Sequence, residues 1–135
     1  GQSMLLHHVG IVVDNLAESI PLFEVWFGAR KIGSIVEDEA QGARIQLFLL
    51  NNETLLEVVE AIPGADTQLH HTGEFHLCYT VPDLDAEMKR LHDLGAVVAH
   101  PIKTAKLFDD HRIAFLATHS GQLVELLEDP NMQMQ

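Results

Sequence analysis

The stretch "LLHHVGIVV", residues 5–13, has the apolar pattern of a buried strand, yet it contains two histidines. A second stretch, "EFHLCYTV" at residues 74–81, has the same character. A helical pattern follows each of them, at residues 16–27 and 83–94, and each helix is expected to end at a glycine, Gly28 or Gly95. Further strands are expected near 30–36, 43–50 and 53–60, and again near 96–100, 111–118 and 121–128. The chain therefore reads as two βαβββ units.

A single offset relates the two units. Adding 68 to a set of positions in the first unit, from the first strand to the last, gives the same residue in the second, although the helix-ending glycines Gly28 and Gly95 differ by 67. The matched pairs include His8 and His76, Val13 and Val81, Leu16 and Leu84, Arg44 and Arg112, Glu57 and Glu125, and Glu60 and Glu128. Internal repetition of this kind indicates the architecture before any single motif does. We expect an α+β fold built from two tandem βαβββ modules.

The length favours one compact domain. A chain of 135 residues that is 47% hydrophobic can bury one core but is short for two independent domains. We expect a single domain over residues 4–135, with module 1 at about 4–62, a linker at 63–73 and module 2 at about 74–130. Residues 1–3 resemble the remnant of a cleaved expression tag.

Composition argues against two classes of partner. Twenty acidic residues against eight basic ones give a formal net charge of -12, which opposes binding to nucleic-acid phosphates. No apolar run approaches the roughly 18 residues of a membrane span, so we expect a soluble, cytoplasmic protein. Cys78 is the only cysteine, which excludes an internal disulfide, and a thiol in an apolar strand is more often a packing residue.

Two local features have simple expectations. Pro21 is expected early in the first helix, where its missing N–H is tolerated best if the helix starts late. The acidic cluster Glu37-Asp38-Glu39 is expected to be a solvated loop.

Two histidines and two glutamates occupy matching positions in the units. His8 and Glu57 are 49 residues apart, and so are His76 and Glu125. Period-two alternation places each glutamate on the apolar face of its strand, where a carboxylate costs several kcal/mol unless a cation compensates it. Ordinary hydrogen bonding in the core explains a single strand histidine well. It gives no reason for four ionisable residues at one offset, so we favour a shared site.

Two imidazoles and two carboxylates form a mixed nitrogen and oxygen ligand set. Such a set suits a divalent ion such as zinc, nickel, cobalt, manganese or iron, and the residue types alone do not select one. If coordination positions remain open, a substrate with two neighbouring oxygens can bind there and be polarised.

The neighbouring ionisable residues are poorer candidates. His7 alternates to the face opposite His8. Glu60 and Glu128 point away from the predicted site and are expected to face solvent. Arg44 and Arg112 are expected to brace equivalent strands or, alternatively, to touch a ligand. His92, His100, His111 and His119 are treated as structural or surface residues.

Four segments together resemble the vicinal oxygen chelate superfamily, which includes glyoxalase I, methylmalonyl-CoA epimerase, extradiol dioxygenases and the fosfomycin and bleomycin resistance proteins. The segments are "HHVGIVVDNLAESIPLFEVWFGA", "TLLEVVE", "FHLCYTVPDLDAEMKRLHDLGA" and "HRIAFLATHSGQLVELLE". The resemblance implies paired modules that form a cupped, mostly antiparallel sheet with helices outside and a metal ion inside. It implies His8, Glu57, His76 and Glu125 as the metal ligands. Whether modules pair within one chain or across a homodimer stays open, and a homodimer is expected.

Within the superfamily the chain is most similar to methylmalonyl-CoA epimerases, which implies proton transfer next to the carbonyl of an acyl-CoA or other thioester. Glu125 is then the first candidate for acid–base catalysis and Glu57 the second. The best-described bacterial epimerases have glutamine at the position of Glu57 and a further glutamate in the third strand, where this chain has Ile45 and Gln46. The second proton-transfer group therefore stays open.

The segment "HPIKTAKLF", residues 100–108, is expected to be a loop that binds the substrate. It carries Lys103 and Lys106 in a chain with only eight basic residues, so these lysines are the first candidates for contacts with the phosphates of CoA. Solvated surface charge is the equally weighted alternative.

The superfamily resemblance also implies three alternative activities. A glyoxalase I-type lactoylglutathione lyase shares the ligand set, but it usually has an arginine near the position of Val12. A non-catalytic small-molecule binding or resistance protein would use the cup without a metal. A ring-opening dioxygenase needs iron(II) and three ligands, which the fourth ligand here disfavours.

Overall fold

The computed structural model describes residues 4–64 and 71–132. The expected tag remnant and residues 65–70 of the expected linker therefore lie outside the described residues. The chain divides into two compact units, His8–Phe75, called here the N-terminal unit, and residues 4–7 with 76–132, called the C-terminal unit. The expected single domain, with its module boundaries, stays a prediction.

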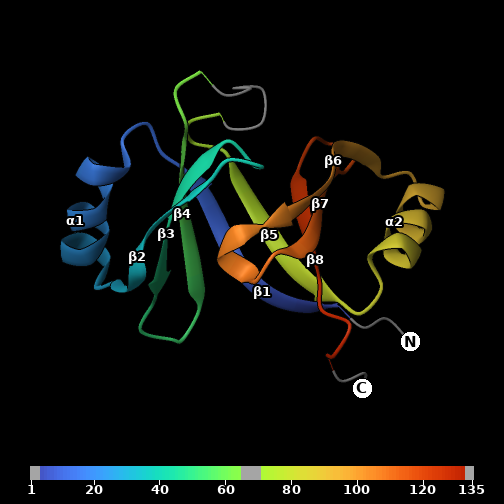
Figure 1. The fold of residues 1–135 in the computed structure, drawn as a ribbon, viewed down its shortest axis with the longest axis horizontal. Helices are drawn as coiled ribbons and strands as arrows, with labels where there is room; N and C mark the ends of the chain where they lie inside the picture. Colours follow the sequence, from blue (N-terminus) through green and yellow to red (C-terminus); the bar gives the residue numbers. More distant parts are fainter. Residues whose placement is uncertain (1–3, 65–70, 133–135) are drawn as a thin grey trace. The chain divides into compact units, whose positions relative to one another are not determined.

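The N-terminal unit contains one helix and a four-stranded sheet (Figure 1). Its elements are β1 (Leu5–Val12), α1 (Leu16–Phe27), β2 (Arg30–Asp38), β3 (Ala43–Leu49) and β4 (Leu55–Ala61). The strand order is β2-β3-β4-β1, in which β2, β3 and β4 pair antiparallel and β1 runs parallel to β4. The first residues of β1, up to His7, belong to the C-terminal unit.

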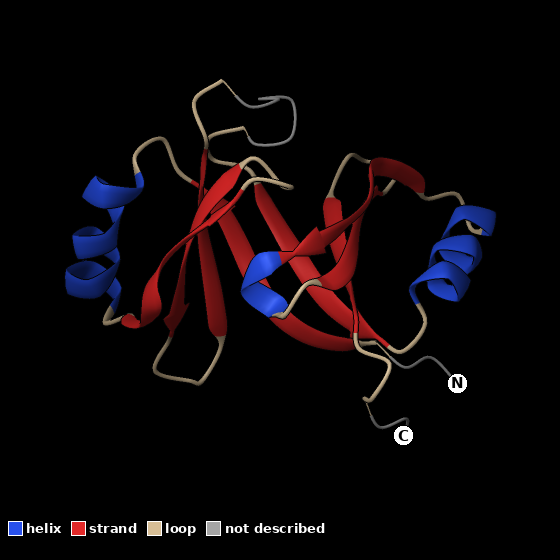
Figure 2. Cartoon of the chain, in the orientation of Figure 1, coloured by secondary structure: helices blue, strands red, loops and turns tan. Residues whose placement is uncertain are grey.

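The C-terminal unit repeats this arrangement (Figure 2). Its further elements are β5 (Phe75–Val81), α2 (Leu84–Asp93), β6 (Val97–Ala105), the 3₁₀ turn η2 (Lys106–Phe108), β7 (His111–Ala117) and β8 (Leu123–Glu128). The order is β5-β8-β7-β6, with β5 parallel to β8 and the other pairs antiparallel. The predicted α+β fold with two βαβββ units is confirmed.

Matching caps begin the two helices. The Asn15 side chain accepts a hydrogen bond from the Glu18 N–H at 3.0 Å, and the Asp83 side chain accepts one from the Ala86 N–H at 3.1 Å. Such caps satisfy backbone donors that have no partner in the first helical turn. Gly28 ends α1 in the left-handed region with φ of 66°, which favours glycine.

Each helix packs on its own sheet and closes a separate apolar core. In the N-terminal unit, α1 lies against β3 and β4, and the core contains Leu16, Phe48, Leu56 and Val58. In the C-terminal unit, α2 lies against β7 and β8, and the core contains Val81, Leu84, Ala114, Leu116 and Leu126. Burial of these side chains is the main favourable term that holds each helix on its sheet. Within residues 4–64 and 71–132, no helix is both long and apolar enough to cross a membrane.

Two local features of the N-terminal unit differ from the simplest expectation. Helix α1 begins at Leu16, as predicted, so Pro21 lies in its second turn, inside the helix, and offers no N–H to the Ala17 carbonyl. Strand β2 continues to Asp38, which was expected in a solvated loop. Asp38 is buried and accepts hydrogen bonds from the backbone and side chain of Gln41, so it organises the turn into β3.

The expected loop at residues 100–108 is also wrong. Strand β6 extends over Val97–Ala105 and η2 follows it. The strand contains Pro101, which cannot donate to a β-ladder. Strand β6 tolerates it because it is the last strand in its unit's order, and its pairing with β7 shifts register on both sides of His100.

Candidate functional site: two buried histidine–glutamate pairs

The first pair joins two parallel strands of the N-terminal unit. His8 lies on β1 and Glu57 on β4, and the register aligns Gly10 with Glu57. The His8 Nε2 and Glu57 Oε2 atoms are 3.4 Å apart. Both residues are buried, with 0% of His8 and 5% of Glu57 exposed.

The second pair is built in the same way in the C-terminal unit. His76 lies on β5 and Glu125 on β8, and the register aligns Cys78 with Glu125. Cys78 is 68 residues after Gly10, so the ladder register repeats together with the side chains. The His76 Nε2 and Glu125 Oε1 atoms are 3.2 Å apart, and both residues are buried.

The atom separations within the pairs suit two ligands of one ion. An N–H···O hydrogen bond usually has a donor–acceptor distance of about 2.7–3.2 Å, which the His8–Glu57 separation of 3.4 Å exceeds. Two ligands about 2.1 Å from a tetrahedral ion lie about 3.4 Å apart. Imidazole nitrogens and carboxylate oxygens are donors that zinc and related divalent ions accept. Both pairs therefore have the donor chemistry of metal ligands, and the His8–Glu57 separation also has their spacing, whereas the 3.2 Å between His76 and Glu125 fits an ordinary hydrogen bond as well.

The next glutamate along each last strand has a structural role. In the N-terminal unit, the Glu60 carboxylate accepts a hydrogen bond from the Leu16 N–H at 3.1 Å and another from Arg44 Nη1 at 3.2 Å. Glu60 thereby ties the start of α1 to strands β3 and β4. The expectation that Glu60 faces solvent is wrong, because these bonds hold it in a half-buried position.

The C-terminal unit contains the equivalent contacts. The Glu128 carboxylate accepts from the Leu84 N–H at 2.9 Å and from two Arg112 nitrogens at 3.0 and 2.8 Å. Glu128 was also expected to face solvent, and that expectation is wrong for the same reason. We call the two sets, Glu60–Arg44–Leu16 and Glu128–Arg112–Leu84, the helix clamps. Within them, both arginines brace neighbouring strands.

The C-terminal clamp shifts two ionisation equilibria. The hydrogen bond from Arg112 lowers the pKa of Glu128, although partial burial opposes this. The same bond, with a second one to Asp85, raises the pKa of Arg112. In the N-terminal clamp, the bond to Glu37 and then that to Glu60 raise the pKa of Arg44. The Arg112 guanidinium therefore favours the charged form of the Glu128 carboxylate.

The two predicted substrate-binding lysines lie at the end of the C-terminal unit's sheet. Lys103 is half-buried on β6, aligned with Ile113 of β7, and Lys106 is exposed in η2. Both lysines were expected on a loop, and the structure instead places Lys103 on a strand and Lys106 in a 3₁₀ turn. Their role in substrate binding stays a prediction.

Sequence reasoning missed one residue on the face that carries the second pair. His100 of β6 aligns with Phe115 of β7, and Phe115 aligns with Glu125 of β8. Aligned residues of neighbouring strands project from the same face of a sheet. Period-two alternation along residues 97–105 does not give the face of His100, because the pairing of β6 with β7 shifts register on both sides of this residue.

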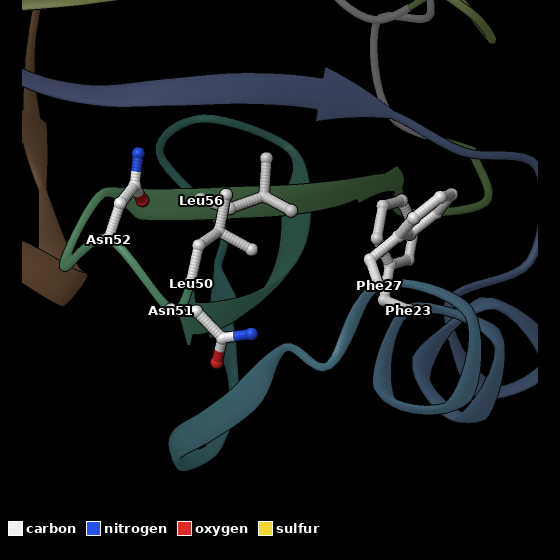
Figure 3. Close-up of a pocket in the computed structure, with 6 residues that line it drawn as sticks. All are labelled: Phe23, Phe27, Leu50, Asn51, Asn52 and Leu56. Atoms are coloured by element: carbon white, nitrogen blue, oxygen red, sulfur yellow. The ribbon is translucent and has the colours of Figure 1, made fainter.

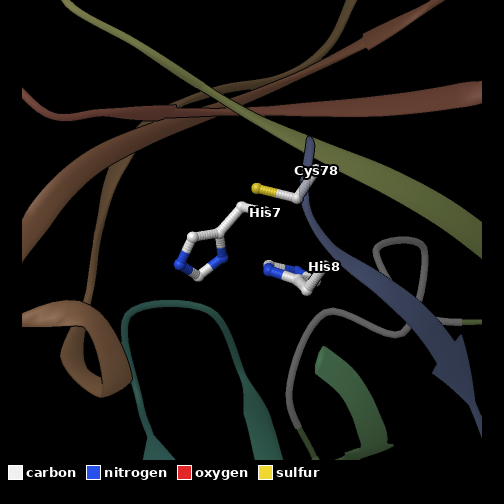
Figure 4. A group of neighbouring side chains, drawn as sticks. All are labelled: His7, His8 and Cys78. Carbon is white, nitrogen blue, oxygen red and sulfur yellow. The ribbon is translucent and has the colours of Figure 1, made fainter. Parts of the chain in front are cut away.

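His7 has a packing role in the C-terminal unit. Its ring contacts Phe108 edge-on, with ring centroids 4.9 Å apart, and a ring nitrogen lies within 4.8 Å of the Cys78 sulfur (Figure 4). Cys78 is fully buried in an apolar cluster with Ala105, Ile113 and Leu127. The expected packing role of Cys78 agrees with this environment.

A separate pocket of about 410 Å³ lies beside α1 in the N-terminal unit (Figure 3). It is lined by Phe23, Phe27, Leu50, Asn51, Asn52 and Leu56. Leu56 and Glu57 are consecutive on β4, so their side chains point to opposite faces of the sheet. The pocket is therefore on the helix side of the sheet and is distinct from the His8–Glu57 pair.

Solved structures share this fold at low sequence identity. The hypothetical protein BH1468 from Bacillus halodurans C-125 matches with a TM-score of 0.76 and 20% identity, covering 99% of this chain and 100% of the other. Methylmalonyl-CoA epimerase from Mycobacterium tuberculosis matches with a TM-score of 0.72 and 23% identity, covering 91% and 86%. A variant of the Streptomyces coelicolor methylmalonyl-CoA epimerase, in complex with 2-nitronate-propionyl-CoA, matches with a TM-score of 0.69 and 19% identity, covering 94% and 99%.

The comparison with curated proteins finds no match to this chain. Residues 7–115, which include three residues of the two pairs, match the family described as the glyoxalase/bleomycin resistance protein/dioxygenase superfamily. The predicted resemblance is thereby confirmed: the chain belongs to the glyoxalase/bleomycin resistance protein/dioxygenase superfamily.

Proposed function

We propose that this protein is a divalent-metal-dependent epimerase or isomerase that removes and returns a proton next to a thioester carbonyl. His8, Glu57, His76 and Glu125 are its metal ligands, so the two pairs share one ion. The methylmalonyl-CoA epimerases among the similar structures support an acyl-CoA substrate, such as methylmalonyl-CoA. A cytoplasmic homodimer is part of this proposal.

The observation that carries the proposal is the repetition of a buried histidine–glutamate pair at one offset and in one ladder register. A buried carboxylate and imidazole are costly in an apolar core, and replacing such pairs with apolar residues is often neutral or stabilising. Descent of the two units from one duplicated unit explains why the apolar core positions repeat. It does not explain why a buried histidine–glutamate pair is kept in both units. A shared divalent ion gives each of the four buried donors a function.

When bound, the ion would polarise the carbonyl oxygen of the substrate and stabilise the negative charge that develops on it. Glu125, as a carboxylate, accepts the proton from the carbon next to the carbonyl, and Glu57, protonated when the substrate binds, gives its proton to the opposite face. The reverse reaction exchanges these two states. The buried surroundings of both carboxylates exclude water, which strengthens their interaction with the transferred proton. The histidine of each pair fixes the orientation of its carboxylate.

Lys103 and Lys106 supply positive charge for the phosphates of the CoA arm. The protein carries a net charge of -12, so an anionic arm needs local cations to bind. Lys103 lies on the same face as Phe115 and Glu125, because its partner Ile113 is two residues from Phe115 on β7. Both lysines are therefore suited to contact the part of the substrate that extends beyond the reacting carbon.

Proton NMR in deuterated buffer tests the reaction. The metal-loaded protein is expected to exchange the C2 proton of methylmalonyl-CoA for deuterium, and Glu125→Gln is expected to slow this by about 10³-fold. Glu128→Gln is the matched control, because it makes the same change three residues along β8 without touching the proposed site. Its exchange rate should stay within about twofold of the wild type.

Three results would replace the proposal. Activity with methylglyoxal and glutathione, without exchange of methylmalonyl-CoA, would indicate a glyoxalase I-type lyase. Metal binding without either activity would leave a metalloenzyme of another type. Ligand binding without metal, and unaffected by Glu125→Gln, would indicate a binding or resistance protein.

A further inference from the structure

Aligned residues form one row across the sheet of the C-terminal unit. The row runs from Cys78 on β5 through Glu125 on β8 and Phe115 on β7 to His100 on β6. Residues aligned in this way project from one face, so His100 belongs to the face of Glu125. Neighbouring strands are about 4.8 Å apart, which places the backbone of His100 roughly 10 Å from that of Glu125.

Phe115 separates two imidazoles on this face. Its ring meets the His76 ring edge-on with centroids 5.2 Å apart, and it meets the His100 ring at the same distance on an angle of 73°. Phe115 also packs against the buried cluster around Cys78 and Ile113, which fixes its position. The face therefore offers a polar pair, then an apolar ring, then a second polar group.

Two basic residues lie beyond His100, one on β6 and one in the turn that follows it. Lys103 follows His100 on the same face, and the 3₁₀ turn with Lys106 follows at the end of the strand. An imidazole provides one hydrogen-bond donor when neutral, whereas an ammonium provides charge. With increasing distance from the Glu125 carboxylate, this face thus offers an apolar contact at Phe115, then a hydrogen bond at His100, and then the positive charge of the lysines.

We propose that His100 is a specificity-determining residue that donates a hydrogen bond to the first amide carbonyl of the substrate's thioester arm. This inference rests on the proposed function and deepens it. In an acyl-CoA the first amide carbonyl is five bonds from the thioester carbon, about 6 Å in an extended chain. That span carries the arm from above Glu125 across the Phe115 ring to His100. The phosphates, which lie much further along the arm, reach the lysines.

A comparison of two substrates distinguishes the role of His100 from that of the lysines. The methylmalonyl thioester of N-acetylcysteamine keeps the first amide of CoA and has no phosphates. His100→Phe preserves the ring that packs on Phe115 and removes the donor, so KM should rise about tenfold for both thioesters, with kcat within about threefold. Lys103→Gln should raise KM about fivefold for the CoA thioester and leave the N-acetylcysteamine thioester unchanged.

Further variants distinguish hydrogen bonding from packing. His100→Gln restores a side-chain N–H and should bring KM back to within about threefold of the wild type. His92→Phe makes the matched change at an exposed position of α2 and should alter neither KM. Melting temperatures of all variants should agree within about 2 °C, because the ring contact with Phe115 is kept or replaced by a side chain of similar length.

Each contrary result has a different meaning. A His100→Phe variant with wild-type KM would show that His100 only packs on Phe115, and would overturn the inference while the proposed function stands. So would a rise in KM that comes with a lower melting temperature in both His100 variants, because that indicates a structural role. If the wild-type protein binds metal but exchanges neither thioester, the proposed function fails and this inference fails with it.

Discussion

The two units share one plan, but they use it differently. The paired His/Glu residues and the helix clamps repeat at one offset and in one register, whereas the outer faces of the helices do not. Helix α1 exposes Leu22, Val25, Trp26 and Phe27, while α2 carries ion pairs between Lys89 and Asp93 and between Arg90 and Glu87. The two units therefore share the buried residues of the pairs and the clamps, and they differ in the exposed faces of their helices.

The two glutamates of the pairs should differ in their effect on the reaction. We expect Glu125→Gln to slow exchange about 10³-fold and Glu57→Gln about 10²-fold, because Glu125 is the proposed base and Glu57 returns the proton. Single-turnover exchange measured with the metal-loaded variants checks this. Equal losses would make the two units equivalent in catalysis, and a larger loss for Glu57→Gln would exchange their assigned roles.

The helices differ in their tolerance of proline. Pro21 of α1 and Lys89 of α2 are related by the offset of 68, and both lie in the second turn of their helix. Lys89→Pro should lower the free energy of unfolding by about 3 kcal/mol, because it removes a helical hydrogen bond and crowds the preceding turn. Urea denaturation measures this.

Pro21→Ala is the reciprocal test of that comparison. It should stabilise the protein by about 1 kcal/mol, since it restores an N–H to the Ala17 carbonyl of α1. Destabilisation by this variant would show that α1 is shaped around its proline. In that event α1 and α2 would differ in backbone geometry and not only in their tolerance of proline.

The helix clamps should have comparable effects on stability. Glu128→Gln and Glu60→Gln should each lower the free energy of unfolding at pH 7 by about 1–2 kcal/mol, because each loses charge-assisted hydrogen bonds. The pKa of Glu128 in the folded protein is lower than its ordinary value of 4.5. Its contribution is therefore complete above the unfolded-state pKa and is lost as pH falls through the folded-state pKa.

Denaturation of the wild type and Glu128→Gln as a function of pH tests that sign. The difference in free energy of unfolding between them should be constant from pH 6 to 8, because Glu128 is ionised there in both the folded and the unfolded protein. It should shrink toward zero in strong acid. A difference that grows as pH falls would contradict the lowered pKa of Glu128. A difference that is absent at neutral pH would show that Arg112 and the start of α2 do not depend on the clamp.

The features that could be predicted from the sequence are those that depend on the alternation of apolar residues in strands and on the repeat of the two units. His8, Glu57, His76 and Glu125 could be selected because a buried ionisable residue in an apolar strand is conspicuous, and because one offset related all four. The roles of Glu60 and Glu128 could not be found in this way. Each depends on a helix N-terminus 44 residues away in the chain, and local pattern says nothing of that contact.

Residues whose local signals conflicted with their tertiary setting were also missed. Residues 100–108 were expected to form a loop, but an edge strand accepts Pro101, so the shared face of His100 and Glu125 was missed. Pro21 is tolerated best where a helix starts late, yet α1 begins at Leu16, because the Asn15 cap and the burial of Leu16 hold the first turn in place. In both cases packing and capping outweighed a backbone preference.

Metal content measures the central claim most directly, because the proposal assigns one ion to donors from both units. Elemental analysis of the purified wild type should find about one divalent ion per chain, with His8→Ala and His76→Ala each losing nearly all of it, while His92→Ala keeps it. Two ions per chain, or retention of metal by either His8→Ala or His76→Ala, would contradict a single site shared by the two units.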